Sequence, residues 1–287
     1  MDIINKKTPL QKALLYIFLI VFCLPFMMPF VYMVSTSLKG DDQIFDPAQA
    51  ERGFRVSDLV PDPVVWDNYP QSMKSVPFLQ YIKNTIVICF FCVIGAVLSS
   101  SMVAYGFARM KFAGRDALFY TMLATMALPG QVTMIPVFVI FKNLGWYDTF
   151  LPIIVPSFFG GAFFIFLLRQ FFMTIPEELS EAARLDGASE WTIFSRVILP
   201  LAKPALATVA LFQFIGSWND FFGPLLYINN PMKYTIAYGL QQFMSSYGGR
   251  WAELMAASCV FTLPIIVIFF LAQKTFVQGI ATTGGKS

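Results

Sequence analysis

Long runs of apolar residues alternate with short charged segments along this chain. Five runs contain no charged residue over 20 or more positions, which is enough to cross a hydrocarbon core of about 30 Å at 1.5 Å per helical residue. These runs are 13–38, 84–108, 117–141, 149–168 and 254–273. A sixth run, 204–227, is equally apolar but contains Asp220. The pattern predicts an all-α integral membrane protein with six transmembrane helices.

The basic residues predict the orientation of these spans, because Lys and Arg are retained on the cytoplasmic side of short loops. Three lysines precede the first span, and the loop 109–116 carries three basic residues, whereas the loop 142–148 has only Lys142. Over all loops, 12 basic residues lie on the first side and 8 on the other. We therefore expect both termini in the cytoplasm. The first run is too long for a secretory signal and is interpreted as an uncleaved span.

Three regions follow from this layout. Residues 1–83 form a tail, the first span and an external loop; residues 84–276 form the core transmembrane domain; residues 277–287 form a cytoplasmic tail. The external loop 39–83 is rich in acidic residues and prolines and is too short for a core of its own. We expect an extended cap there, which serves either as a solvated connector or in binding.

The amino-acid composition limits the kinds of catalytic and binding site that the chain can form. Apolar residues make up 57% of the chain and charged residues 13%, and histidine is absent. Without histidine, Ser-His-Asp, Cys-His and zinc-protease sites are excluded. The four cysteines lie in apolar runs and are interpreted as small hydrophobic residues, so no metal site is expected. A net charge of +3, spread over short clusters, does not indicate nucleic-acid binding.

Two further features bear on transport and on nucleotide binding. The C-terminal sequence G-I-A-T-T-G-G-K-S has five residues between Gly279 and Gly285, one more than a phosphate-binding loop requires. Asp220 is the one ionisable residue within the predicted spans, fewer than a proton- or sodium-driven carrier would need. Trp218, Asn219 and Asp220 are weak candidates for a translocation pathway. Pro and Gly within the spans fit either a moving pathway or ordinary kinked packing.

The cytoplasmic loop 169–203 is predicted to be folded. Thr174 and Glu177 match a capping box, and Gly187 suits a left-handed helix end, so we expect a helix over about 175–186. Glu181 and Arg184 are three residues apart and can pair. A second helix is expected from Ser189. The two would form a helix-turn-helix that contacts another protein or, alternatively, packs only on its own spans.

The same loop resembles a known family. Residues 181–183 read E-A-A, Gly187 follows after three residues, and 197–200 read V-I-L-P after nine more. This resembles the EAA signature of permease subunits of ATP-binding-cassette (ABC) importers, with Val197 where the family usually has Ile. Further segments are similar to the carbohydrate-importing, MalG-like branch, namely 104–109, 129–133, 169–172, 185–189, 216–220 and 277–280.

The resemblance implies a type I ABC importer permease fold in a bacterial inner membrane, in contact with membrane lipid. Its implied partners are a MalF-like second permease, a homodimeric ATPase that binds ATP and Mg, and an external solute-binding protein. This chain would bind no cofactor and have no catalytic site. The implied ATPase-coupling residues are Glu181, Ala182, Ala183, Arg184, Asp186, Gly187, Leu199 and Pro200.

The resemblance also places an external loop within reach of the binding protein. Its residues are Ser246, Tyr247, Gly248, Gly249 and Trp251. The C-terminal tail is implied to touch the ATPase. Importers of mono- and oligosaccharides and of glycerol phosphate share these motifs, so the carbohydrate stays open. The rival classes are a channel or ion-coupled carrier and a membrane enzyme, and the EAA pattern separates the importer from both.

Overall fold

The computed structural model describes residues 8–246 and 250–284, and these residues form helices and loops without a strand. They divide into two compact units, which are described separately. The smaller comprises Met1–Val76 and Leu240–Thr262, and the larger comprises Pro77–Gly239 and Leu263–Ser287.

The predicted spans correspond to helical segments. Four are long and apolar enough to cross a membrane: α2 (Pro9–Ser37), α6 (Phe78–Arg109), Leu151–Thr174, and Trp251–Gln273 in α17 (Trp251–Gly284). Two bent helix pairs raise the number to six, if each pair is one span. In the third predicted span, α7 (Arg115–Thr125) and α8 (Gly130–Asn143) meet at 97°. The second pair joins Glu190–Leu201 to α14 (Lys203–Trp218) at 79°. Within the fifth predicted span, α14 ends early and α15 (Phe222–Tyr227) follows.

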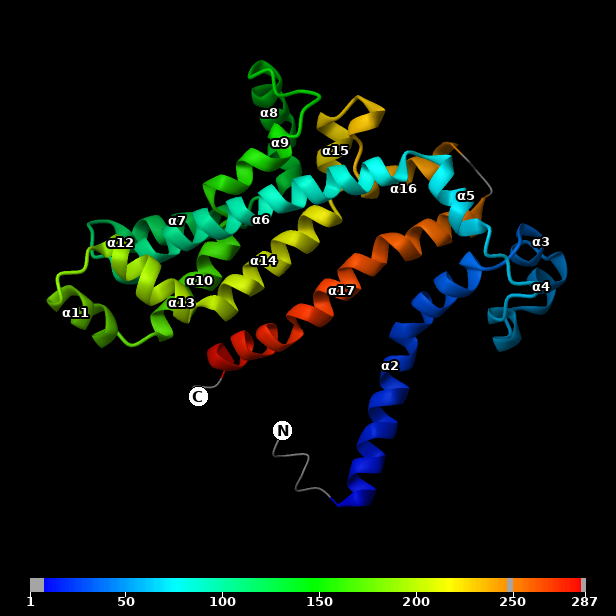
Figure 1. Ribbon diagram of the computed structural model, residues 1–287, viewed down its shortest axis with the longest axis horizontal. Helices are drawn as coiled ribbons and strands as arrows, with labels where there is room; N and C mark the ends of the chain where they lie inside the picture. Colours follow the sequence, from blue (N-terminus) through cyan, green and yellow to red (C-terminus); the bar gives the residue numbers. More distant parts are fainter. Residues whose placement is uncertain (1–7, 247–249, 285–287) are drawn as a thin grey trace. The chain divides into compact units, whose positions relative to one another are not determined.

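Helix α6 is the central element of the larger unit (Figure 1). It packs against α10 (Ala162–Thr174), α14 and the short segments α9 (Leu151–Ile154) and η2 (Val155–Phe159). Gly95 permits the close approach of η2, because an added Cβ would lie 2.5 Å from Ser157 Oγ. Ser99 Oγ donates a hydrogen bond to the Ser157 carbonyl at 3.0 Å. Small and hydroxyl-bearing residues therefore join η2, in the fourth predicted span, to α6.

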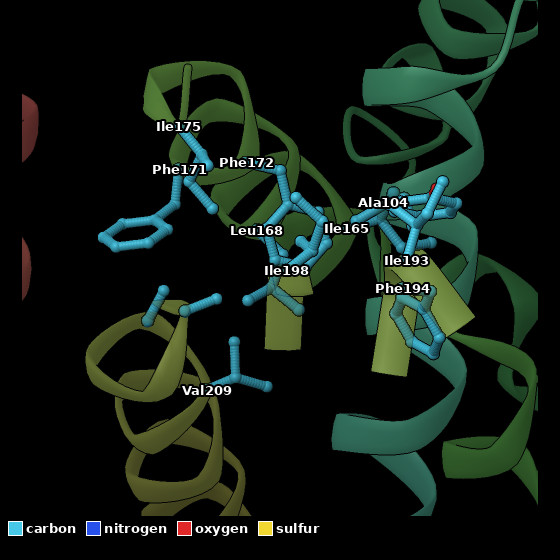
Figure 2. Close-up of a cluster of buried hydrophobic side chains, with 13 residues drawn as sticks. Ala104, Ile165, Leu168, Phe171, Phe172, Ile175, Ile193, Phe194, Ile198 and Val209 are labelled. Atoms are coloured by element: carbon cyan, nitrogen blue, oxygen red, sulfur yellow. The ribbon is translucent and has the colours of Figure 1, made fainter. Parts of the chain in front are cut away.

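A cluster of thirteen buried side chains fills one end of this unit (Figure 2). The cluster joins α6, α10, α14 and the segment from α12 (Glu190–Thr192) through η3 (Ile193–Ile198) to α13 (Leu199–Leu201). Leu168, Phe172, Ile193 and Ile198 are fully buried in it. Burying each such side chain contributes about 1.5–3 kcal/mol. The loop 169–203 is therefore anchored on the spans by its second helix.

The part of the loop 39–83 that lies in the smaller unit, up to Val76, is folded rather than extended. It contains α3 (Asp41–Ile44), α4 (Pro47–Arg52), η1 (Val56–Leu59) and α5 (Asn68–Ser75). Asn68 Nδ2 donates to the carbonyls of Ser37 and Lys39 at 3.0 and 2.8 Å. Arg52 pairs with Asp58 at 2.7 Å. The expectation of an extended cap is wrong, because side chains satisfy the loop's backbone groups locally.

Candidate functional site

The EAA segment begins with helix α11 (Glu178–Leu185). Gly187 has a φ of +81°, and its N–H donates to the Arg184 carbonyl at 3.0 Å. The Ala188 N–H donates to the Ala183 carbonyl at 2.9 Å. These bonds satisfy carbonyls at the helix end, in the way that a left-handed glycine permits. The predicted helix and its glycine end are confirmed, although the helix begins about three residues later than expected.

Most of the implied coupling residues on α11 are exposed. Glu181, Ala182, Arg184 and Asp186 face solvent, whereas Ala183 is half-buried against the cluster of Figure 2. Leu185 is 90% exposed, which is unusual for a large apolar side chain and was not singled out in the sequence. A short helix thus presents charged, small and apolar residues on one accessible surface, as protein interfaces do.

The second helix of the segment anchors it on the spans. The Ser189 hydroxyl accepts a hydrogen bond from the Thr192 N–H at 3.3 Å, which confirms the predicted start. Residues Ile193–Ile198 then form a π-helix, a rare form that is frequent at functional sites. Leu199 is half-buried and Pro200 exposed. Pro200 lies in the first turn of α13, where its missing N–H is tolerated. The Ala202 N–H donates to the carbonyls of Ile198 and Leu199 and closes the last turn.

Two local predictions about this segment are wrong. The Thr174 hydroxyl donates to the Phe171 carbonyl at 2.7 Å and does not cap α11. The N-cap residue of α11 is Glu177, and its side chain makes no capping hydrogen bond. Arg184 pairs with Glu190 rather than Glu181, with Nε at 2.8 Å from Oε1. The turn at Gly187 brings the start of the second helix back beside α11, which the local spacing does not reveal.

The end of α6 is tied to the same segment. Tyr105 donates its hydroxyl to Glu190 Oε2 at 2.5 Å, and Arg109 Nη2 donates to the carbonyls of Phe172, at 2.6 Å, and Ile175. Hydrogen bonds from Arg184 and Tyr105 hold the pKa of Glu190 below its ordinary value of 4.5, so this carboxylate is ionised at neutral pH.

A mixed-charge cavity of about 310 Å³ opens between these groups. Glu177, Glu181, Arg184 and Glu190 line it together with residues of the segment 109–111. Neither Tyr105 nor Glu190 was expected as a site residue. Their roles depend on a contact 85 residues apart in the chain.

The weak pathway candidates lie where α14 ends. Trp218 is buried and stacks on Phe214 with ring centroids 5.4 Å apart. Asn219 is exposed and donates to the Ile215 carbonyl at 2.8 Å. Asp220 Oδ1 accepts from the Gly223 N–H at 2.9 Å, which caps α15. The structure thus gives Asp220 a local structural role.

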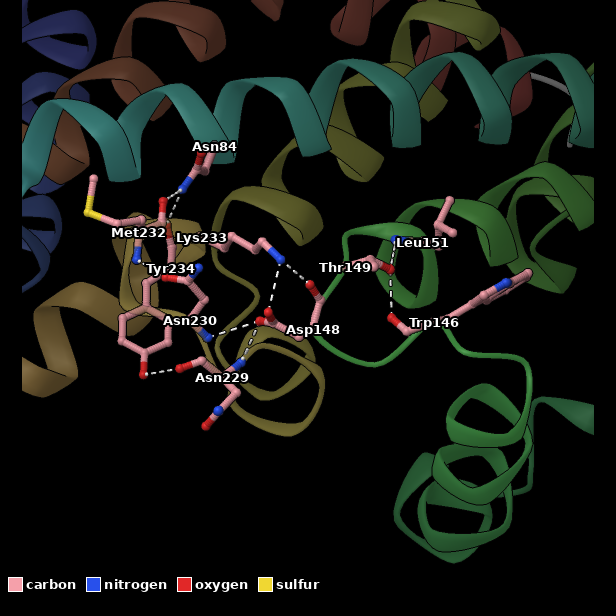
Figure 3. Close-up of polar contacts among 10 residues, drawn as sticks. All are labelled: Asn84, Trp146, Asp148, Thr149, Leu151, Asn229, Asn230, Met232, Lys233 and Tyr234. Carbon is pink, nitrogen blue, oxygen red and sulfur yellow. Dashed lines mark hydrogen bonds and ion pairs between the residues drawn. The ribbon is translucent and has the colours of Figure 1, made fainter.

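Beyond these helices, Asp148 joins two loops of the larger unit (Figure 3). Its carboxylate accepts from the N–H groups of Asn229 and Asn230 at 3.0 and 2.9 Å and from Lys233 Nζ at 2.9 Å. The hydrogen bonds from Asn230 and Lys233 lower the pKa of Asp148 below 3.8. Asn84 Nδ2 of α6 donates to the carbonyls of Met232 and Tyr234 at 2.9 and 3.0 Å.

The implied binding-protein loop is only partly described. Tyr247, Gly248 and Gly249 lie outside the described residues. Ser246 ends α16 (Ile236–Ser246), and Trp251 begins α17 with a 40% exposed side chain. The tail 277–287 is described only as far as Gly284, as helical backbone. Within the described parts of the chain, no group of three or more Cys, Asp or Glu residues could hold a metal ion.

Comparison with known proteins places this architecture among transporters. The model of a family described as "binding-protein-dependent transport system inner membrane component" matches residues 96–282. The arabinooligosaccharides transport system permease protein AraQ of Bacillus subtilis is 30% identical over 98% of both chains. The maltose/maltodextrin transport system permease protein MalG of Escherichia coli is 30% identical over 96% of this chain and 97% of its own.

The fold has a solved counterpart. A chain from the crystal structure of a bacterial ABC transporter involved in the import of the acidic polysaccharide alginate superimposes with a TM-score of 0.79. It is 26% identical and covers 93% of this chain and 96% of that one. A second structure, of the bacterial alginate ABC transporter with an alginate-bound periplasmic protein, has a TM-score of 0.59 at 19% identity and supports the fold alone.

Proposed function

The chain belongs to the family of binding-protein-dependent transport inner-membrane components, and we propose that α11 docks it onto an ATPase that drives carbohydrate import. The chain is then the membrane-spanning permease subunit of an ABC importer. ATP and Mg are bound and hydrolysed by the ATPase partner, and this chain supplies no catalytic group.

The observation that carries the proposal is the contrast between the two helices of the EAA segment. Ile193 and Ile198 of the second helix are fully buried, whereas α11 exposes Glu181 and Leu185. A helix that packs only on its own spans would bury its apolar residues. The alternative of a purely internal loop is therefore disfavoured for α11, and a partner surface is the better explanation of an exposed leucine.

The same contrast supports a lever mechanism. ATP binding closes the two ATPase subunits, and each carries its docked α11 with it. Because the second helix shares a close-packed core with α6, α10 and α14, a displacement of α11 is passed to the spans rather than absorbed. The translocation pathway then alternates between inward-open and outward-open forms.

The remaining parts of the proposed assembly are those that the family resemblance implies. A MalF-like second permease would complete the pathway, and an external solute-binding protein would deliver the solute. The loop with Trp251 would contact that binding protein, and both termini would lie in the cytoplasm. The relatives are named for arabinooligosaccharides, maltose and maltodextrin, and a related structure for alginate. A saccharide is therefore the substrate class that we propose.

Charge reversal at Glu181 tests the docking. Glu181→Lys should leave the amount of protein in the membrane unchanged but abolish uptake of maltose, arabinotriose and alginate oligosaccharides, whichever of these probes the wild type imports. Glu178→Lys is the matched control, because Glu178 is also an exposed residue of α11 but lies outside the EAA pattern. ATP hydrolysis should continue in the Glu181 variant without transport. Normal uptake in that variant would refute the proposal.

A further inference from the structure

Glu190 is bonded on both sides to other helices. One carboxylate oxygen accepts from Tyr105 of α6 at 2.5 Å, and the other accepts from Arg184 of α11 at 2.8 Å. A carboxylate that accepts from a cation and a hydroxyl makes charge-assisted bonds, which are shorter and stronger than neutral ones. Three elements of the fold, α6, α11 and α12, thus meet at one side chain.

Helix α6 is unbroken between Tyr105, near its C-terminal end, and its start at Phe78. It spans 32 residues, a length of about 48 Å at 1.5 Å per residue. Near its start, Asn84 is bonded to the carbonyls of Met232 and Tyr234, in the loop that Asp148 joins (Figure 3). The helix is therefore fastened by polar side chains to the EAA segment at one end and to the 229–234 loop near the other.

We propose that the Tyr105–Glu190–Arg184 contact is the joint through which displacement of α11 is passed to α6. Tyr105 and Glu190 are then positioning residues for transport. This inference rests on the proposed function, because it assumes that an ATPase moves α11. It adds the element that receives the movement and the groups that transmit it.

The joint is separable from the stability of the fold. The ring of Tyr105 packs on Phe194 with centroids 5.2 Å apart, and this contact needs no hydroxyl. Arg109 independently holds the same end of α6 to the carbonyls of Phe172 in α10 and of Ile175 just after it. Removing the Tyr105 hydroxyl or the Glu190 charge should therefore leave the buried core in place while loosening α11 from α6.

The test measures the distance between spin labels on α11 and α6. Labels replace the exposed Glu178 and Met102 in the assembled importer, whose native cysteines are replaced by serine or alanine. The distance is recorded without nucleotide and after trapping with MgATP and vanadate. The variants are Tyr105→Phe, Glu190→Gln and their combination, and Tyr120→Phe on α7, whose tyrosine is exposed, is the matched control.

With the joint intact, the two labels keep one narrow distance distribution in both states, and the control variant behaves identically. In Tyr105→Phe and in Glu190→Gln, the distribution shifts or broadens on trapping. The combined variant is no worse than the more affected single one, because both substitutions weaken the same Tyr105–Glu190–Arg184 contact. Variant distributions identical to the wild type in both states would overturn the inference, as would additive effects or a wild-type distance that changes on trapping.

A structural defect is recognised separately. It would lower the amount of assembled complex in size-exclusion chromatography but would leave the distance in the remaining complex unchanged, and that result also counts against the joint. Failure of the proposed function has a different signature, because Glu181→Lys in the same complex would then import normally.

Discussion

The left-handed glycine at the end of α11 offers a quantitative test of the coupling segment. Gly187 has a φ of +81°, and a Cβ at this position would have nothing within 4 Å. Alanine would therefore meet no steric clash with the rest of the protein. Its whole cost is that of placing an L-residue in the left-handed region, about 1–2 kcal/mol.

Other substitutions rank by the same argument. Asparagine tolerates the left-handed region better than alanine, so Gly187→Asn should cost less. Proline requires a φ near −65° and has no N–H, so Gly187→Pro also loses the bond to the Arg184 carbonyl. Its cost should be about 3 kcal/mol or more.

Amide hydrogen exchange over 178–187 in the purified complex is the assay. A loss of 1–2 kcal/mol corresponds to about 5–30-fold faster exchange for Gly187→Ala. Exchange should be slowest in the wild type, then Gly187→Asn, then Gly187→Ala, then Gly187→Pro. Gly114→Ala is the control, since Gly114 has a φ of +80° in open space on another loop, and it should leave exchange over 178–187 unchanged. Equal exchange in the alanine and proline variants would refute the reasoning.

Three further predictions concern packing, pH and a buried hydroxyl. A Cβ at Gly95 would lie 2.5 Å from Ser157 Oγ, so Gly95→Ala should cost about 1–3 kcal/mol of unfolding free energy in detergent. At Gly106 a Cβ would meet open space, so Gly106→Ala should instead gain about 0.5–1 kcal/mol. The opposite order would contradict the packing of η2 on α6. The folded-state pKa of Asp148 is lowered, so its contribution is present above pH 3.8 and is lost as the pH falls through the lowered value. The difference in Tm between wild type and Asp148→Asn should therefore be constant above about pH 5 and shrink below pH 3.8, and a difference that grows on acidification would show the sign to be wrong. The Ser180 hydroxyl is buried without a hydrogen-bond partner, so Ser180→Ala should leave the melting temperature unchanged or raise it, and a drop of several degrees would reveal a partner for it.

Charge-free runs predict the membrane spans because the cost of burying a charge in lipid acts on every residue of a run. That rule gives the positions of the six apolar segments but not their interruptions. The run 117–141 is broken at Pro129 by a 97° bend, and the run 204–227 is broken where Asp220 caps a new helix. The hydrogen bonds at both breaks are local ones, such as those from the Val132 N–H to the Pro129 carbonyl and from the Gly223 N–H to Asp220, and a count of charges does not reveal them.

In the coupling segment, too, local features can be predicted from the sequence and long-range contacts cannot. Gly187 and Ser189 act on their own neighbours, so their roles are legible in the sequence. Arg184 was expected to pair with Glu181, and only the folded turn brings Glu190 to it. The contact of Glu190 with Tyr105 joins segments far apart in the chain, and no local spacing predicts it.

We propose above all that α11 is the surface that meets the ATPase. A photo-cross-linking amino acid in place of Leu185, the 90% exposed leucine of this helix, tests it most directly in the membrane-embedded importer. We expect a covalent product between this chain and the ATPase subunit, and none from the same amino acid in place of Leu79, which is exposed near the opposite end of α6. An importer that transports normally yet gives no ATPase cross-link from position 185 would contradict it.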